Sequence, residues 1–314
     1  MQSIELCAGA GGQALGLEQA GFHHALLVEN DAHACSTLRH NRPEWDVKEE
    51  DLKSFDPSTL EHVDLLAGGL PCPPFSVAGK KLGHEDERNL FPEAEAIIDH
   101  VRPKAVMIEN VKGILEAGFL EFREAFLGPL KKMGYVADWK LVQSADYGVP
   151  QLRPRAVLVA VQHPYAGQFR WPKPQPSRKT VGDALFKEVA SNGWTKAEQW
   201  ALKAAMIAPT IVGGSKKHGG PDLGPTRAKK AWLEFDVDGK GIGNAPPNPD
   251  HEGPIRLTNR MVASLQGFPD DWHFVGGKTA VYRQIGNAFP PPVAHAIALQ
   301  IYNVLEASPV MIRI

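Results

Sequence analysis

A mostly apolar run at residues 63–67 ends in two glycines, and Cys72 follows, enclosed by prolines at positions 71, 73 and 74. Such runs are typical of strands buried in a parallel sheet. Because proline holds φ near about −65° and restricts the residue before it, the thiol would lie on a stiff loop at the end of the strand. Open α/β sheets bind their ligands at that end. The run therefore predicts an α/β fold in which Cys72 is either a nucleophile or, like most free cysteines, a small buried apolar residue.

A glycine-rich turn at residues 9–12 follows a short strand predicted at 3–8. Glycines there permit a tight strand-to-helix turn and let backbone N–H groups approach a ligand at the start of the helix. A second predicted strand ends at Glu29, about 20 residues further on, where dinucleotide-binding folds place a carboxylate for ribose hydroxyls. The alternative role, opening the next helix, suits Asp31 better. Asp51 ends a third strand and could bind an adenine amino group, so a nucleotide-like cofactor is predicted.

Charged side chains also follow later strands. One predicted strand ends at Glu109, at the sheet edge where Cys72 is expected. Arg153 and Arg155 alternate on an extended segment and would face one side of it, unless both are simply solvated. The long polar loop at residues 77–91 lies beside this expected site and is predicted to close over substrate.

The chain has 314 residues, enough for a large domain and a smaller one. From residue 172 onward, proline- and glycine-rich segments predict the second domain. Its basic clusters suit contact with phosphate, or are merely a solvated surface. The lysines and arginines of these clusters are Lys216, Lys217, Arg227, Lys229 and Lys230.

Composition excludes several classes of protein. The formal net charge of −2 gives no sign of nucleic-acid binding by itself, and the three cysteines lack the spacing of a disulfide framework or a zinc site. No uninterrupted apolar run is long enough to span a bilayer, and the first residues lack a charged and apolar leader. A soluble, cytoplasmic protein without a metal is expected.

Six stretches, in this order along the chain, resemble the motifs of the DNA (cytosine-5) methyltransferases. They are residues 5–12, Gly-Leu-Pro-Cys at 69–72, Glu-Asn-Val at 109–111, Gln-Leu-Arg-Pro-Arg at 151–155, residues 256–269 and Gln-Ile-Gly-Asn-Ala at 284–288. The segment at 256–269 includes a helix predicted to have Thr258 as its N-cap and Gly267 just past its end. Only about residues 172–253 fall outside the resemblance, where the family keeps its variable target-recognition region.

The resemblance implies a doubly wound, Rossmann-like methyltransferase fold, with residues 1–171 and 278–314 as the catalytic domain and 172–277 as a small target-recognition domain. It implies that the enzyme transfers a methyl group from S-adenosylmethionine to carbon 5 of a cytosine flipped out of a specific duplex DNA sequence. The product would be S-adenosylhomocysteine, and the path would run through a covalent bond between the thiol and carbon 6 of the base. The catalytic residues implied are Cys72, Glu109, Arg153 and Arg155.

Matching motif by motif also assigns contacts to the cofactor and to DNA. The implied cofactor-binding residues are Cys7, Ala8, Gly9, Gly11, Gly12, Glu29, Asn30, Asp51, Leu52, Pro71, Leu90, Asn287 and Ala288. Ser76 and Arg88 of the polar loop would contact DNA, together with the basic clusters of the second domain. Cys7 and Asn30 depart from the family pattern, which usually has aromatic residues there, so the adenine pocket would lack a wall. Pro73 replaces a common glutamine.

Three other functions compete with DNA cytosine-5 methylation. A nicotinamide-dependent oxidoreductase would also use the glycine turn and Glu29, but gives no reason for Cys72, Glu109 and Arg155 at successive strand ends. A DNA-binding module with a dead site would not need those three residues either. The nearest rival is a cytosine-5 methyltransferase of the same fold that acts on structured RNA. A monomer is expected, as is a restriction endonuclease that cuts the same site without forming a stable complex with this chain.

Overall fold

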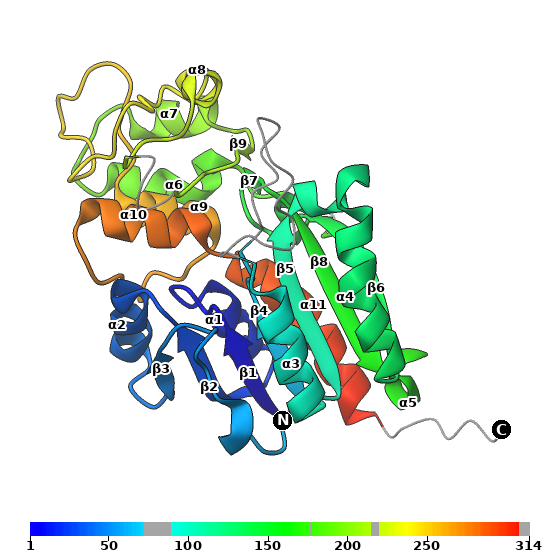
Figure 1. Cartoon of the computed structure of the whole chain (residues 1–314). Coiled ribbons are helices and arrows are strands. Elements are labelled where there is room, and N and C mark those ends of the chain that lie inside the picture. The colour runs from blue at the N-terminus through cyan, green and yellow to red at the C-terminus, as the bar shows by residue number, and fades with distance from the viewer. Residues whose placement is uncertain (72–88, 176–177, 215–219, 308–314) are drawn as a thin grey trace.

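The structure, a computed structural model, describes residues 1–71, 89–175, 178–214 and 220–307 (Figure 1). Its centre is a seven-stranded sheet with the order β3-β2-β1-β4-β5-β8-β6. The first five strands in this order are parallel, whereas β8 runs antiparallel to both β5 and β6. The strands are β1 (Gln2–Leu6), β2 (His23–Glu29), β3 (Val47–Glu49), β4 (Leu65–Gly68), β5 (Ala105–Val111), β6 (Tyr135–Gln143) and β8 (Pro154–Gln162). The order reverses between β1 and β4, which confirms the predicted doubly wound α/β fold.

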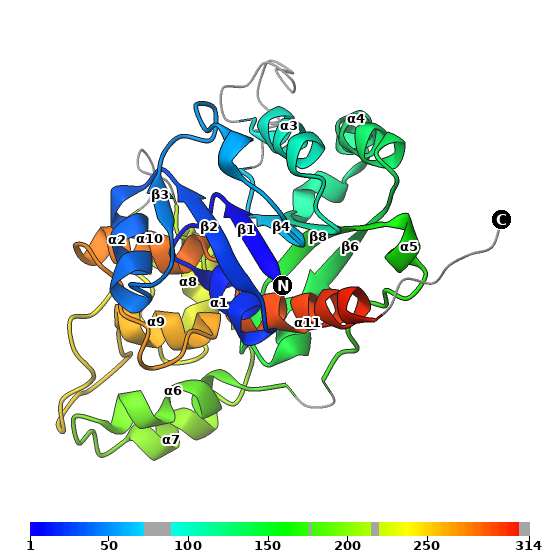
Figure 2. The same ribbon diagram turned by 90° about the horizontal axis from the view of Figure 1, so that it is seen from below.

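In the inner strands of this sheet, side chains alternate between the two faces and are mostly buried on both. In β5, Val106 and Ile108 belong to one hydrophobic cluster, and Ala105 and Met107 belong to another. Helices α3 and α4 cover the first face, and α1 and α11 cover the second (Figure 2). These helices are α1 (Gly12–Gln19), α3 (Phe91–Val101), α4 (Leu120–Lys132) and α11 (Pro291–Glu306). Burial on both faces explains why β4 and the first half of β5, at residues 65–68 and 105–108, contain no polar residue.

A smaller unit of short helices lies above the sheet in the view of Figure 1. It contains β7 (Gln151–Leu152), α6 (Val181–Ala190), α7 (Ala197–Lys203), β9 (Ala208–Pro209), α8 (Thr226–Leu233), α9 (Asn259–Gln266) and α10 (Lys278–Asn287). Two other helices, α2 (Ala32–Asn41) and α5 (His163–Ala166), belong to the large unit. Within the described ranges, no helix is both long enough and apolar enough to cross a membrane.

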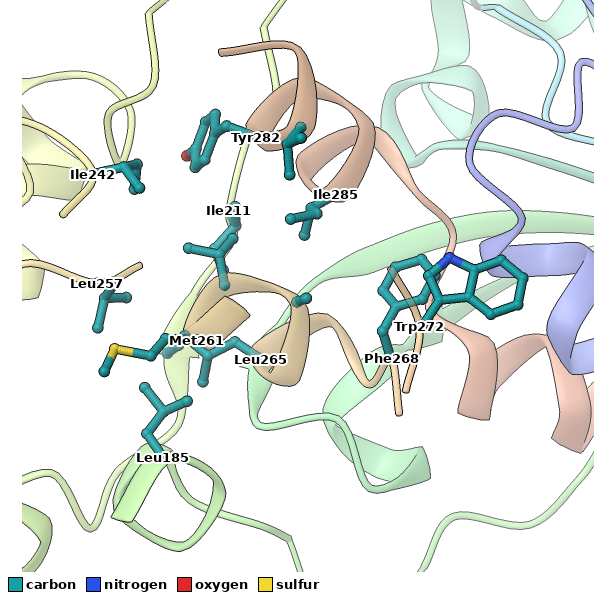
Figure 3. Close-up of a cluster of buried hydrophobic side chains, with 14 of the residues drawn as sticks. Leu185, Ile211, Ile242, Leu257, Met261, Leu265, Phe268, Trp272, Tyr282 and Ile285 are labelled. Carbon is teal, nitrogen blue, oxygen red and sulfur yellow. The ribbon is translucent and has the colours of Figure 1, made fainter. Parts of the chain in front are cut away.

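A third hydrophobic cluster joins the two units. Leu185 of α6, Leu265 of α9 and Ile285 of α10 are buried in it (Figure 3). Trp272 extends the cluster to Trp45 of the large unit, with ring centroids 6.1 Å apart. Helix α10, which starts at the boundary predicted at residue 278, packs against α9 of the smaller unit, and the next helix, α11, packs on the sheet. The domain boundary at residue 278 stays a prediction.

Helix α9 begins and ends where its sequence predicts. The Thr258 hydroxyl accepts a hydrogen bond from Met261 N at 3.1 Å, and Gly267 adopts a φ of 85° at the other end. A left-handed residue is favourable there because it satisfies the last carbonyls of the helix, and only glycine adopts it without strain. Both caps of the predicted helix are confirmed.

His24 of β2 is held neutral beneath α1. Its Nε2 lies 3.0 Å from the carbonyl oxygen of Ala14, and its Nδ1 lies 3.0 Å from Ser3 Oγ. The carbonyl can only accept, so Nε2 carries the proton and Nδ1 accepts from the serine hydroxyl. Burial lowers the pKa of the imidazole from 6.5 to about 4.

We predict that this histidine makes the fold sensitive to acid. An unfolded histidine binds its proton near pH 6.5 and the folded one only near pH 4, so the folded state loses stability as the pH falls through that window. Between pH 7 and 4.5 the loss attributable to His24 is about 2 to 3 kcal/mol. Urea unfolding at both pH values should therefore show a smaller acid loss for His24→Gln. His23→Gln, at the exposed neighbouring position, should lose as much stability in acid as the wild type. If His24→Gln also lost as much stability as the wild type, the acid sensitivity could not be assigned to His24.

Candidate active site

A cavity of about 310 Å³ lies at the carboxyl ends of β1, β2, β4 and β5, beside the point where the strand order reverses. Most of the residues predicted to contact a cofactor line it. They are Cys7, Ala8, Gly9, Gly12, Glu29, Asn30, Leu52, Pro71, Leu90, Asn287 and Ala288. Glu109 lines the same cavity, so the predicted cofactor site and the predicted catalytic carboxyl share one space.

Two predicted cofactor residues lie outside the lining. Gly11 is the N-cap of α1, with a φ of 86°, and a Cβ added to it would lie 2.7 Å from the ring of Trp272. Asp51 is exposed, and its Oδ1 accepts a hydrogen bond from Lys53 N at 3.0 Å. Glu50, its neighbour, lines the cavity in its place.

The glycine turn is shaped by close backbone contacts. Gly9 has a φ of +54°, and its N–H donates to Glu29 Oε2 at 2.7 Å. A Cβ on Gly12 would lie 2.3 Å from the carbonyl oxygen of Phe289, so no other residue fits at the start of α1 without moving the backbone. The turn therefore joins β1, β2 and the segment before α11 around the cavity.

Glu29 is fixed by backbone donors. Besides Gly9, the N–H groups of Asn30 and Asp31 donate to its Oε1 at 2.9 and 2.8 Å. Burial raises the pKa of Glu29, and the three N–H groups oppose that effect. Oε2 has one such donor and retains a lone pair for a ligand hydroxyl. Asp31 caps α2 through His33 N, as predicted.

Glu109, which lines the cavity, forms an ion pair with Arg155, and β1 and β4 lie between its strand and that of Glu29. Glu109 Oε1 lies 2.8 Å from Arg155 Nε, and each side chain is only 12% exposed. β5 and β8 run antiparallel side by side, which brings the two residues together although they are far apart in sequence. Burial raises the pKa of Glu109, whereas Arg155 and Arg153 lower it. A Cβ on Gly69, at the end of β4, would lie 3.6 Å from Glu109 Oε2.

Arg153 makes a different set of contacts. It is fully buried and donates to the carbonyl oxygens of Ile211, Gly286 and Ala288 at 2.6, 2.7 and 3.0 Å. Burial lowers the pKa of its guanidinium. Arg153 thus connects the segment before β8 to Ile211, which follows β9, and to the end of α10. Its positive charge acts on Glu109 only through space. The alternative of two solvated arginines is excluded.

The surroundings of Cys7 make its thiol unreactive. It has a φ of 54° and lines the cavity, and burial followed by the charge of Glu29 raises its pKa. Thiolate formation is therefore suppressed at Cys7. Among the described residues, no three side chains of the metal-binding types gather as ligands.

The predicted nucleophile and several of the predicted DNA-contacting residues lie outside the described ranges. The remaining predicted DNA-contacting residues are on α8. Those outside are Cys72, Ser76, Arg88, Lys216 and Lys217, together with most of the predicted lid. On α8, Arg227 and Lys230 are exposed, whereas Lys229 Nζ pairs with Asp222 Oδ2 at 2.8 Å. That ion pair reduces the charge that the cluster offers to phosphate.

Several residues that line the cavity were not predicted from the sequence, among them Glu5, Gln13 and Arg283. Arg283 precedes the predicted Asn287 by one helical turn, and this spacing is a signal that could have identified it. Its Nη2 lies 3.6 Å from Asp31 Oδ2, across the cavity from α10 to α2. Glu5 lies between two core residues of β1, and burial, followed by the charge of Glu29, raises its pKa well above the usual range.

Comparison with known proteins agrees with this geometry. Residues 1–303 match the model of the family described as C-5 cytosine-specific DNA methylase. The chain is 54% identical over 315 residues to the Type II methyltransferase M.NaeI of Lentzea aerocolonigenes, which covers 98% of this chain and 76% of that protein. It is 50% identical over 308 residues to the Type II methyltransferase M.NgoMIV of Neisseria gonorrhoeae, covering 97% and 98% of the two chains.

Solved structures share the fold. A DNA modification methyltransferase encoded within an E. coli prophage has a TM-score of 0.69 at 24% identity, over 98% of this chain and all of that one. DNMT2 of Spodoptera frugiperda has a TM-score of 0.64 at 18% identity, over 96% and 99% of the two chains. The family match also removes the oxidoreductase and the inactive DNA-binding module from consideration. The chain belongs to the C-5 cytosine-specific DNA methylases, the enzymes that methylate cytosine in DNA.

Proposed function

We propose that this enzyme moves the methyl group of S-adenosylmethionine to carbon 5 of a cytosine flipped out of a specific duplex DNA sequence, through a covalent bond between Cys72 and carbon 6. The observation that carries the proposal is that Glu29, on β2, and Glu109, on β5 and paired with Arg155, line one cavity with β1 and β4 between their strands. The Glu29 side suits the ribose of a nucleoside cofactor, and the Glu109 side suits the polar edge of a pyrimidine.

The residues present fit the cofactor. The close approach of Gly12 to Phe289 leaves a narrow backbone-lined cradle, and Oε2 of Glu29 retains acceptor capacity for a ribose hydroxyl. Leu52 and Leu90 offer apolar surface to an adenine ring. When bound, S-adenosylmethionine would supply a methyl group on a positively charged sulfur, and the carboxyl-rich lining favours that charge.

Carbon 5 of cytosine is a weak nucleophile, so the residues of the active site must activate it. The Cys72 thiolate adds to carbon 6, and a protonated Glu109 gives its proton to ring nitrogen 3, so the ring stays neutral while carbon 5 gains electron density. Arg155 holds oxygen 2 of the base and orients Glu109. As carbon 5 takes the methyl group, nitrogen 3 returns its proton to Glu109. The proton on carbon 5 then leaves to a base, and the electron pair it leaves behind expels the Cys72 sulfur.

The proposed role of residues 172–277 is to read the target sequence. Arg227 and Lys230 on α8 are exposed cations that would contact phosphates. The loop from Ser76 to Arg88 would close over the flipped base and offset the energy of unstacking it. We further propose that the enzyme acts as a cytoplasmic monomer at the nucleoid, with a restriction endonuclease directed at the same site.

We expect Cys72→Ala to abolish methyl transfer, because no other group would activate carbon 6. Duplex DNA with 5-fluorocytosine at the target should become covalently attached to the wild type, since fluorine cannot leave as a proton, and not to the variant. Denaturing electrophoresis of labelled DNA measures this directly. Cys35→Ala is the matched control, because burial raises the pKa of that thiol to about 12 and it should be inert. An adduct with Cys72→Ala, or transfer to structured RNA in preference to DNA, would contradict the proposal.

We expect Glu109→Gln to lower the rate of methyl transfer by about 100-fold or more, because the amide cannot give a proton to nitrogen 3. In the wild type only the protonated carboxyl supplies that proton, so single-turnover rates should fall as the pH rises through the raised pKa of Glu109. The variant should lack this alkaline decline and should bind S-adenosylhomocysteine as tightly as the wild type. Glu116→Gln, at an exposed position, should change neither quantity. An unchanged pH profile in Glu109→Gln would exclude the proton transfer.

A further inference from the structure

Gln13 is a buried side chain whose amide has no hydrogen-bond partner among the residues that the structure describes. It is the second residue of α1, it is 4% exposed, and it lines the cavity that contains Glu29 and Glu109. Neither its Oε1 nor its Nε2 makes a hydrogen bond to any described residue. A buried amide without partners destabilises the folded protein, because both groups lose water and gain nothing in return. Such a group in a native cavity indicates that a ligand completes it.

The position of Gln13 indicates which part of a ligand this would be. Glu29 lines one side of the cavity from the end of β2, and Glu109 lines another side from β5. The first turn of α1 and residues 288–289 form a third side, and a Cβ on Gly12 would lie 3.1 Å from Ala288 Cβ. The first N–H groups of a helix have no partner within it, and the N-cap Gly11 makes no side-chain cap. This side of the cavity is therefore suited to an anionic group.

The cofactor has three parts to be placed. Its ribose belongs at Glu29, and its sulfur must face Glu109, where the base is bound. The amino-acid end is left for the side formed by α1. Arg283 also lines the cavity, but its Nη2 lies 3.6 Å from Asp31 Oδ2. Its charge is thus already paired with a carboxylate of the protein.

We propose that Gln13 binds the amino-acid end of S-adenosylmethionine: its Nε2 donates to the carboxylate and its Oε1 accepts from the ammonium. The inference rests on the proposed function. A side-chain amide carries a donor and an acceptor on one group, and this combination matches a zwitterion as no single charged residue does. Gln13 thereby fixes the direction in which the cofactor lies, with its sulfur toward Glu109.

Two ligands that differ only in the amino-acid end test this. S-adenosylhomocysteine carries that end, whereas 5′-methylthioadenosine has the same nucleoside and sulfur without it. Isothermal calorimetry of the wild type and Gln13→Met should show S-adenosylhomocysteine bound about tenfold or more weakly by the variant, with the affinity for 5′-methylthioadenosine unchanged. Gln19→Met, at an exposed position of the same helix, should leave both affinities unchanged.

The possible outcomes separate the inference from the proposed function. Equal weakening of both ligands by Gln13→Met would show a structural role, and no weakening would show no role; either result overturns the inference while leaving the cofactor in place. A wild type that binds neither ligand would overturn the proposed function, and the inference with it. If Gln13→Met fails to fold, Gln13→Glu, which keeps the size of the side chain, should reject S-adenosylhomocysteine alone by repelling its carboxylate; equal affinity for it would again overturn the inference.

Discussion

The close approach of α1 to the end of the chain determines the shape of the active site. A Cβ on Gly12 would lie 2.3 Å from Phe289 O, and one on Gly16 would lie 2.5 Å from Ala294 Cβ. Trp272 lies against Gly11 and donates from its indole nitrogen to Ala10 O at 3.2 Å. Because glycine alone allows this contact, the backbone of α1 lies within reach of α10 and α11 and closes one side of the cavity. The first and last motifs of the chain are thus parts of one wall.

The cavity enclosed in this way concentrates buried carboxyls. Glu5, Glu29 and Glu109 all line it, and burial raises the pKa of each. Their environments then differ: Glu29 receives three backbone N–H groups, Glu109 receives a guanidinium, and Glu5 Oε2 has no described partner. Such divergence suits carboxyls with different tasks. It supports a division in which Glu29 binds as an anion and Glu109 exchanges a proton.

The sequence predicted well whatever depends on local chemistry. Apolar runs predicted the buried strands, and Thr258 and Gly267 predicted both ends of α9. The position of Glu29 at the end of a predicted strand indicated its place in the cavity. Alternation alone could not separate Arg153 from Arg155, because their partners lie far away in the sequence. Arg153 donates to a carbonyl just after β9 and to one on α10, whereas Arg155 pairs with Glu109 of β5. Gln13 was missed for the same reason, since its isolation within the cavity is a property of the tertiary packing.

If the cavity holds a nucleoside cofactor with its ribose at Glu29 and its sulfur toward Glu109, a crystal structure with S-adenosylhomocysteine bound will show this arrangement. We expect ribose hydroxyls within hydrogen-bond distance of Glu29 and a sulfur atom that faces Glu109. A ligand bound elsewhere, or one whose sulfur points away from the Glu109–Arg155 ion pair, would contradict it.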